Sequence, residues 1–323
     1  MKKIPNRQVH LDFHTSEMID QVGSKFSAEE FAATLKNANV EAVTLFTRCH
    51  HGNLYYDSTK YPERIHPHLK VKDMYREQAK ECRKKGIKVY LYTTICWDIR
   101  VAAEHPEWVA IDDYARISRR ETGNIFEDPG FHVDLCINSP YREFCKEQIA
   151  DALEDCPVDG VLVDASFVVE CCCPRCRKSM LEKHLNPADP QDRKKHAWQI
   201  YYDFVREMTD YLHEIDSDYD IFFNKGHVGA QDIPVRDCFD YVAVESQPAN
   251  CGYMDFPVSA RYLRTWGVPV VGMTGRFLTG WGDNNSYRNQ AALEYESFSA
   301  LSYGGLCNIG DQLPPSGQLD KDS

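Results

Sequence analysis

The sequence has little that would suit a membrane or a nucleic acid. No stretch approaches the ~18 consecutive apolar residues of a membrane-spanning helix, and no apolar run follows the two lysines near the N-terminus, so these residues do not form a secretion signal. Lys and Arg number 37 against 49 Asp and Glu, and the formal net charge is −12. Because phosphate binding needs clustered basic residues, we expect neither a nucleic-acid partner nor a membrane.

The cysteines do not come in an even number. The chain has 13 of them, and without a secretion signal such thiols are by default reduced rather than disulfide-bonded. We therefore predict a cytoplasmic protein. At 43% hydrophobic residues the chain can bury a sizeable core, and its 323 residues suit one α/β barrel with insertions.

A glycine-rich phosphate-binding turn is also missing after the first apolar run, where a dinucleotide-binding sheet would carry it. Short β-rich apolar runs instead alternate with longer helical stretches. The predicted strands are 9–13, 42–46, 88–93, 160–163, 221–223, 241–244, 268–273 and 306–309. The predicted helices include 28–36, 71–85, 142–153, 198–215, 256–265 and 290–302.

Eight units of strand followed by helix predict parallel strands that are buried on both faces. A closed (β/α)8 TIM barrel accounts for them, and a doubly wound open sheet is the alternative. Ser27 and Ser139 are expected to cap two of the helices. We expect one domain over residues 1–323, which is either a complete protein or the catalytic part of a longer one with accessory domains.

The carboxyl ends of the strands form the active-site rim of such barrels. Residues that follow the predicted strands are unusually polar or aromatic: Asp12, His14, Glu17, Cys49, His50, His51, Trp97, Asp98, Asp164, Asn224, His227, Glu245, Thr274, Arg276, Trp281, Asn308 and Asp311. Taken singly, an aspartate after a strand is most often a helix cap or turn residue, and a histidine is most often a satisfied structural residue. Their convergence on one rim from separate strands is something that packing alone does not require.

Paired carboxyl groups at this rim are what glycoside cleavage needs, one to donate a proton and one to attack the anomeric carbon or activate water. Asp164 directly follows the run VDGVLV and is the candidate nucleophile, and Glu245 follows YVAV and is the candidate acid/base. A salt bridge at the rim is the structural alternative for Glu245. Trp97, Trp281 and Tyr253 are expected to offer apolar platforms to a sugar.

The remaining rim residues are expected to contact the same substrate. Histidine side chains suit sugar hydroxyls because they both donate and accept hydrogen bonds. The expected substrate contacts, besides the two tryptophans, are His14, Glu17, His50, His51, Asp98, Asn224 and Arg276. No cofactor is required for this chemistry.

A cysteine cluster lies after the fourth predicted strand, where residues 171–176 are CCCPRC. Cys171, Cys173 and Cys176 have the spacing to share one tetrahedral zinc ion with a fourth ligand from elsewhere. Cys136 and Cys145 are both candidates for that ligand, and a set of unligated thiols is the alternative. A complete cysteine shell leaves no open position, so we expect a structural rather than a catalytic metal.

Motifs along nearly the whole chain resemble a known family. HLDFHTSE, TRCHHGNLYY, HPEWVA, LCINSPYRE, VDGVLVDAS, CxCPRC, FFNKGH, GMTGRF and GDQLPPSG together resemble the barrel domain called hypothetical glycosyl hydrolase 6, found in the α-L-fucosidases of glycoside hydrolase family 151. CHHGNLYY is also distantly similar to the histidine pair that contacts fucose in family 29 fucosidases. The resemblance implies an exo-acting, retaining α-L-fucosidase with Asp164 as nucleophile, and Glu245 as acid/base rests on its place after a strand.

The resemblance leaves the oligomeric state open. Related proteins often carry further domains after the barrel, including a trimerisation domain similar to that of family 42 β-galactosidases, so a homo-oligomer is one expectation. The cysteine run also resembles the structural zinc site of those enzymes. However, they use an Asn-Glu pair after the fourth strand, where this chain has Val163-Asp164. That departure disfavours β-galactosidase chemistry.

Three other functions remain as alternatives. One is another exo-glycosidase, such as a galactosidase-like enzyme, and one is a carbohydrate-binding barrel without turnover. The third is a metal-dependent hydrolase, for which HLDFH superficially offers a histidine pair. His10 and His14 are four residues apart, so along an extended strand they would lie ~13 Å from one another, too far to chelate one ion.

Overall fold

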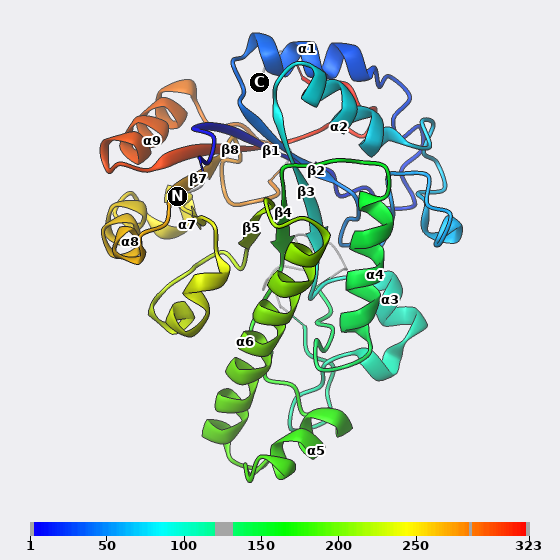
Figure 1. The fold of residues 1–323 in the computed structure, drawn as a ribbon, viewed down its shortest axis with the longest axis vertical. Helices are drawn as coiled ribbons and strands as arrows, with labels where there is room; N and C mark the ends of the chain where they lie inside the picture. The colour runs from blue at the N-terminus through cyan, green and yellow to red at the C-terminus, as the bar shows by residue number, and fades with distance from the viewer. Residues whose placement is uncertain (1–2, 120–131, 284–285, 321–323) are drawn as a thin grey trace.

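The computed structural model describes residues 3–119, 132–283 and 286–320. Its strands are β1 (Arg7–Asp12), β2 (Ala42–Phe46), β3 (Lys88–Thr94), β4 (Gly160–Asp164), β5 (Asp220–Phe223), β6 (Val242–Glu245), β7 (Val270–Gly275) and β8 (Leu306–Gln312). Its helices are α1 (Ala28–Asn37), α2 (Met74–Lys84), α3 (Ile99–Glu104), α4 (Tyr141–Leu153), α5 (Pro174–Glu182), α6 (Pro190–Ile215), α7 (Pro248–Cys251), α8 (Asp255–Leu263) and α9 (Gln290–Ser302). Figure 1 shows the helices arranged around the strands.

All eight strands are parallel and lie in one sheet, in the order β5-β4-β3-β2-β1-β8-β7-β6. The sheet curls into a nearly closed barrel, which confirms the predicted (β/α)8 fold. In the described part of the chain no ladder joins β5 to β6. Near the start of this seam the Asp240 N–H donates to Ile221 O (3.1 Å), and the Ile221 N–H donates to Asp240 Oδ2 (2.9 Å).

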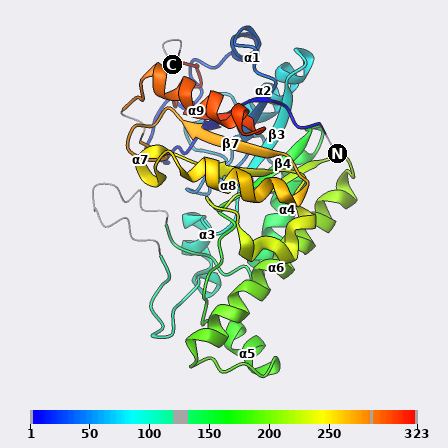
Figure 2. The ribbon, with the colours of Figure 1, turned by 90° about the vertical axis from the view of Figure 1, so that its left-hand side faces the viewer.

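Some element boundaries agree with those predicted from the sequence, and others do not. Strand β2 has the predicted limits, and Ser27 caps α1 by accepting the Glu30 N–H at 3.3 Å. Ser139 Oγ accepts the Tyr141 N–H, but Pro140 is the N-cap of α4, so the cap lies one residue later than predicted. Helix α6 begins at Pro190, eight residues before the predicted start. The sequence did not reveal these residues as helical, because the first two turns are mostly polar and lack an apolar stripe. Figure 2 shows this end of α6 extending away from the barrel together with α5.

The barrel interior below its mouth is filled with rings. Phe46 of β2 stacks on Tyr92 of β3 at 3.7 Å between ring centroids. His10 of β1 contacts both of these rings edge-on and also contacts Trp281, which comes from the β7–α9 connection. This packed layer lies directly below the residues of the rim and supports them. No helix in the described residues is long and apolar enough to cross a membrane.

A fully buried ion pair fixes the two long connections at the rim. Arg48, just after β2, donates from Nη1 to Asp98 Oδ2 at 2.6 Å, and its Nη2 donates to the Thr94 carbonyl. Asp98 Oδ1 accepts the Val101 N–H and so caps α3. Both charged side chains are 0% exposed. The pair therefore ties the connection after β2, which carries the histidine pair, to the connection after β3.

Replacing Asp98 tests how much this pair stabilises the fold. In Asp98→Ala the Arg48 guanidinium would stay buried without its counterion, which typically costs about 3–5 kcal/mol. We expect that loss in the free energy of unfolding measured with denaturant. The control is Glu182→Ala, which breaks the exposed pair Lys178–Glu182 and should cost less than about 1 kcal/mol. Equal losses in the two variants would contradict the role of the buried pair.

Candidate active site

Two carboxylates lie side by side where β4 and β6 end. Asp164 is the last residue of β4 and Glu245 is the last residue of β6. Asn224, the first residue after β5, lies between them and donates from Nδ2 to Asp164 Oδ1 (2.8 Å) and to Glu245 Oε1 (2.6 Å). The three residues thus come together because neighbouring parallel strands end at the same rim.

Asp164 is surrounded by hydrogen-bond donors. Tyr92 donates its hydroxyl proton to Asp164 Oδ2 at 2.6 Å, and His50 Nε2 lies 3.9 Å from the same oxygen. Burial raises the pKa of Asp164, while the Tyr92 hydroxyl, the Ala165 N–H and the Asn224 amide act in the opposite direction. The donors therefore favour the ionised form of Asp164 and oppose the effect of burial on its pKa.

Glu245 is biased towards its protonated form. Burial raises the pKa of Glu245 to about 7, and the nearby charge of Asp164 adds to the effect. Two carboxylates this close do not both ionise easily. At neutral pH and slightly below, the pair can therefore supply one proton donor and one nucleophilic carboxylate, which is the division of roles that glycoside cleavage needs.

A histidine wall stands beside Asp164. The rings of His14 and His50 stack at 4.2 Å between centroids. The backbone N–H of His50 donates to His14 Nδ1. Burial lowers the pKa of His14 to about 4 and lowers the pKa of His50 well below its ordinary value. His51 is half-buried, and burial lowers its pKa as well. Neutral imidazoles both donate and accept hydrogen bonds, so this wall suits hydroxyl groups.

The two tryptophans border the mouth on different sides. Trp97 contacts His50 edge-on at 5.0 Å, and its indole N–H donates to Asp134 Oδ1 at 3.0 Å. Trp281 packs against Gly310 of β8 so closely that any Cβ at this position would overlap the indole ring. Glycine in β8 is therefore what lets Trp281 sit inside the barrel mouth.

The other residues expected to contact the substrate differ in how exposed their side chains are. Glu17 is exposed, and its charge acts on His51. Arg276 is mostly buried at the end of β7, where it pairs with Asp311 and lies over the Tyr287 ring. The expectation that Asp98 contacts the substrate is corrected by the structure. Its two oxygens cap α3 and pair with Arg48.

Asn224 also differs from the expectation of a substrate contact. Its side chain is almost wholly buried, and both hydrogens of its amide group point to carboxylates rather than to the open mouth. Its position beside the two carboxylates was predictable, but this use of the amide was not.

Two further residues of the site were not singled out from the sequence. Tyr92 and Thr94 lie within the apolar run of β3, and Thr94 Oγ1 hydrogen-bonds to His50 Nδ1 at 2.8 Å. The alternation of side chains along a strand would have placed both on the inner face, in register with Leu162 and Asp164 of β4.

His10 and His14 both approach Asp12, at 3.1 and 3.9 Å from its Oδ1 atom. Strand β1 ends at Asp12, so the extended-strand spacing does not apply to His14. Even so, among the described residues one group of three or more His, Cys, Asp or Glu side chains lies close enough together to hold a metal ion, and it contains neither histidine.

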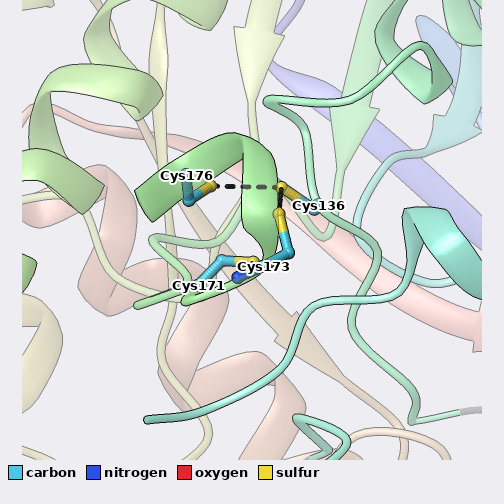
Figure 3. A group of neighbouring side chains, drawn as sticks. All are labelled: Cys136, Cys171, Cys173 and Cys176. Atoms are coloured by element: carbon cyan, nitrogen blue, oxygen red, sulfur yellow. Dashed lines mark hydrogen bonds between the residues drawn. The ribbon is translucent and has the colours of Figure 1, made fainter. Parts of the chain in front are cut away.

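That group is Cys136, Cys171, Cys173 and Cys176, all buried, with sulfur atoms within 4.8 Å of one another. Figure 3 shows Cys136 reaching from the end of the β3–α4 connection towards the three cysteines at the start of α5. Cys136 Sγ lies 3.5 Å from Cys176 Sγ and 3.9 Å from Cys173 Sγ. Cys145 lies elsewhere, beside Arg48, so the structure selects Cys136 as the fourth member.

The donors around the sulfur atoms suit a metal centre. The Cys173 N–H points to Cys171 Sγ at 3.4 Å, and the Asn138 amide points to Cys176 Sγ at 3.5 Å. Such N–H groups stabilise thiolates, which are the form that binds zinc. The four cysteines could therefore hold a metal ion.

Comparison with known proteins finds one family model and several solved structures that the chain resembles. Residues 27–165 match the family model described as hypothetical glycosyl hydrolase 6, which confirms the resemblance seen in the sequence. α-L-Fucosidase isoenzyme 2 from Paenibacillus thiaminolyticus is 34% identical, with a TM-score of 0.91, over 99% of this chain and 47% of its own. No curated protein matches the chain.

More distant structures share the fold. A β-galactosidase from the psychrophilic Marinomonas ef1 has a TM-score of 0.67 at 13% identity, over 95% of this chain and 54% of its own. A family 29 α-L-fucosidase from Bacteroides thetaiotaomicron has a TM-score of 0.57 at 15% identity, over 93% and 58%.

The chain spans about half the length of each of these structures. Residues 27–165 thus resemble a hypothetical glycosyl hydrolase 6 domain, and the whole chain resembles about half of a protein described as an α-L-fucosidase.

Proposed function

We propose that the chain is the barrel of a retaining, exo-acting α-L-fucosidase, with Asp164 as nucleophile and Glu245 as acid/base. The observation that carries this proposal is the pair of carboxylates that one amide nitrogen joins. Laid end to end, the two hydrogen bonds of 2.8 and 2.6 Å reach no further than the carboxyl separation of about 5–5.5 Å that retaining glycosidases use. Inverting enzymes need about 6.5–9.5 Å to admit a water molecule.

In the first step Asp164 attacks the anomeric carbon while Glu245 gives its proton to the departing glycosidic oxygen. This step forms an ester between the sugar and Asp164 and leaves Glu245 ionised. In the second step Glu245 takes a proton from water as the water oxygen attacks the same carbon, which frees Asp164 and restores the proton on Glu245. No cofactor enters either step.

Two features of the site support the choice of fucose as the sugar. One is the histidine wall beside Asp164, and the other is the pair of tryptophans. His14, His50 and His51, with Glu17 and Arg276 further out, offer donors and acceptors to the hydroxyls of the sugar. Trp97 and Trp281 offer apolar surface to its ring and methyl group. The 34% identity to a protein described as an α-L-fucosidase supports the same choice.

We also propose that the cysteine group holds one structural zinc ion. The four sulfur atoms would supply a complete tetrahedral shell, so the ion would cross-link the β3–α4 connection to the start of α5 without taking part in the reaction. All 13 cysteines are free thiols in the structure, which supports a reducing, cytoplasmic location.

Removing the nucleophile tests the assignment of roles. We expect Asp164→Ala to lower kcat/KM on an aryl α-L-fucoside by on the order of 10³–10⁶-fold, because no group remains to form the ester. The control is Asp159→Asn at the opposite end of the same strand, where Asp159 binds Arg83 and the Val89 N–H, and it should keep its activity. Full activity in Asp164→Ala would contradict the proposal, and turnover of only another aryl glycoside would change the sugar.

The pH dependence tests Glu245 as the proton donor. Glu245 acts while protonated, so kcat/KM should fall as the pH rises through its pKa of about 7. Glu245→Gln should lose about 10²–10⁴-fold with a poor leaving group and should lack this alkaline decline. An alkaline decline that survives unchanged in Glu245→Gln would assign the proton donor to another residue.

Cysteine substitutions test the zinc site. We expect wild-type protein to bind one zinc ion per chain, measured by elemental analysis, and Cys173→Ser to lose it, with a lower unfolding temperature. Cys172→Ser is the matched control, since Cys172 is buried in the same run but is outside the sulfur group, and it should retain the metal. If a chelator lowers the unfolding temperature of wild-type protein and of Cys173→Ser equally, the proposed site is not the source of the stability.

A further inference from the structure

We propose that Asn224 is a positioning residue that directs the acid proton of Glu245 to its Oε2 atom and, together with Tyr92, occupies both oxygens of Asp164 with hydrogen-bond donors. This inference rests on the proposed function, because it gives the two carboxylates the roles described above. Asn224 was expected to contact the substrate. We infer instead that it holds the acid/base and the nucleophile in place through one hydrogen bond to each.

The orientation of the Asn224 amide is fixed by its surroundings. Its Oδ1 accepts the Gly226 N–H at 3.2 Å, so Nδ2 must face the two carboxylates. The reverse orientation would set Oδ1 against two carboxylate oxygens and the NH2 group against an N–H donor, which is repulsive on both sides. The backbone of Asn224 is held too, since its N–H donates to Val163 O (2.8 Å) and its carbonyl accepts from Ser166 N (3.0 Å) and Ser166 Oγ (2.9 Å).

Gly226 makes this orientation possible. Its φ is +81°, in the left-handed region that favours glycine, and this turn brings its N–H back onto the side chain of Asn224. A Cβ at Gly226 would also stand 3.9 Å from Glu245 Oε2, so the turn borders that oxygen. The sequence Asn-Lys-Gly after β5 thus presents an oriented amide and leaves Oε2 of Glu245 without a bulky neighbour on this side.

The two hydrogens of the amide determine where the proton of the pair can lie. One hydrogen is donated to Glu245 Oε1, so that oxygen is an acceptor and the proton of neutral Glu245 belongs on Oε2. The other hydrogen is donated to Asp164 Oδ1, and Tyr92 occupies Oδ2. Because both oxygens of Asp164 already accept hydrogen bonds, the proton of the pair is directed to Glu245.

The same geometry suits the movement of charge during the reaction. As Asp164 forms the ester it loses its negative charge, and Glu245 gains one as it gives up its proton. The Asn224 nitrogen is within hydrogen-bond distance of both carboxylates from the start. The stronger, charge-assisted hydrogen bond can therefore pass from Asp164 to Glu245 without any movement of the amide.

The test replaces Asn224 and follows the protonation of Glu245 directly as well as through turnover. Infrared difference spectra across a pH titration report the C=O band of a protonated carboxyl group, and Glu245→Gln identifies the band. In Asn224→Ala we expect the titration midpoint to move to higher pH, because the lost hydrogen bond holds the pKa of Glu245 down. A midpoint that does not move would overturn the inference, whether or not the protein turns over a glycoside.

Kinetics on an aryl α-L-fucoside give the second readout. Losing a hydrogen bond to a charged group should lower kcat roughly 10–100-fold, with little change in KM, and move the acid and alkaline limbs of the pH profile to higher pH. The acid limb moves because Asn224 also holds down the pKa of Asp164. A loss confined to KM would instead make Asn224 a substrate contact and would overturn the inference.

Two further variants complete the test. Ser166→Ala is the control, since it removes a hydrogen bond to the backbone of Asn224 and leaves the amide in place, so both limbs and the infrared midpoint should stay where they are. Asn224→Asp keeps the shape of the side chain and carries the test if Asn224→Ala does not fold. It should lose more activity than Asn224→Ala, because a third carboxylate would face the pair, and equal or higher activity would overturn the inference. Wild-type protein that hydrolyses no aryl glycoside would refute the proposed function alone, because the infrared midpoint tests Asn224 separately.

Discussion

The constraint on which the site depends is the burial of two carboxylates beside each other at the barrel mouth. Like charges in a poorly solvated place repel and lose hydration, so such a pair is tolerated only with donors around it or with one member neutral. Here both conditions are present. Tyr92 and Asn224 serve Asp164, and burial together with the charge of Asp164 favours the proton on Glu245. The same repulsion that destabilises the fold locally therefore suits the proposed roles of one carboxyl group as acid and the other as nucleophile.

The barrel supplies this arrangement through its seam between β5 and β6. At the start of the seam Asp240 joins the two strands through hydrogen bonds to Ile221. At the end of the seam Asn224 and Glu245 join them through side chains. A polar contact between the Asn224 and Glu245 side chains thus takes the place of a continuous ladder of backbone hydrogen bonds at this end of the two strands.

The rest of the scaffold holds the surroundings of that contact rigid. The buried pair of Arg48 and Asp98 fixes the connection that carries His50, and Gly310 admits Trp281 to the mouth. Farther out, the four cysteines join the β3–α4 connection to α5. Each device acts on a connection at the carboxyl ends of the strands, which is where a parallel barrel has room for function.

The sequence predicted those features that a local pattern determines. Asp164 and Glu245 could be placed because each ends an apolar run, and a polar residue there must lie at the rim. Asp98 was misplaced because a helix cap and a rim residue look alike in sequence, and only the position of Arg48 distinguishes them. Cys136 could not be chosen over Cys145, since a contact between segments about 35 residues apart leaves no spacing signal. The role of the Asn224 amide could not be predicted from the sequence, because it depends on which way the side chain faces.

In the proposed reaction, Asp164 forms a covalent bond to the sugar. The most direct measurement is to incubate the protein with a 2-fluoro-fucosyl fluoride, whose fluorine slows the second step more than the first, and to locate the added mass among the peptides. We expect one fluorofucosyl group per chain, on the peptide that contains Asp164. A label on another carboxylate, or turnover of a fucoside with no trapped intermediate and inversion at the anomeric carbon, would contradict it.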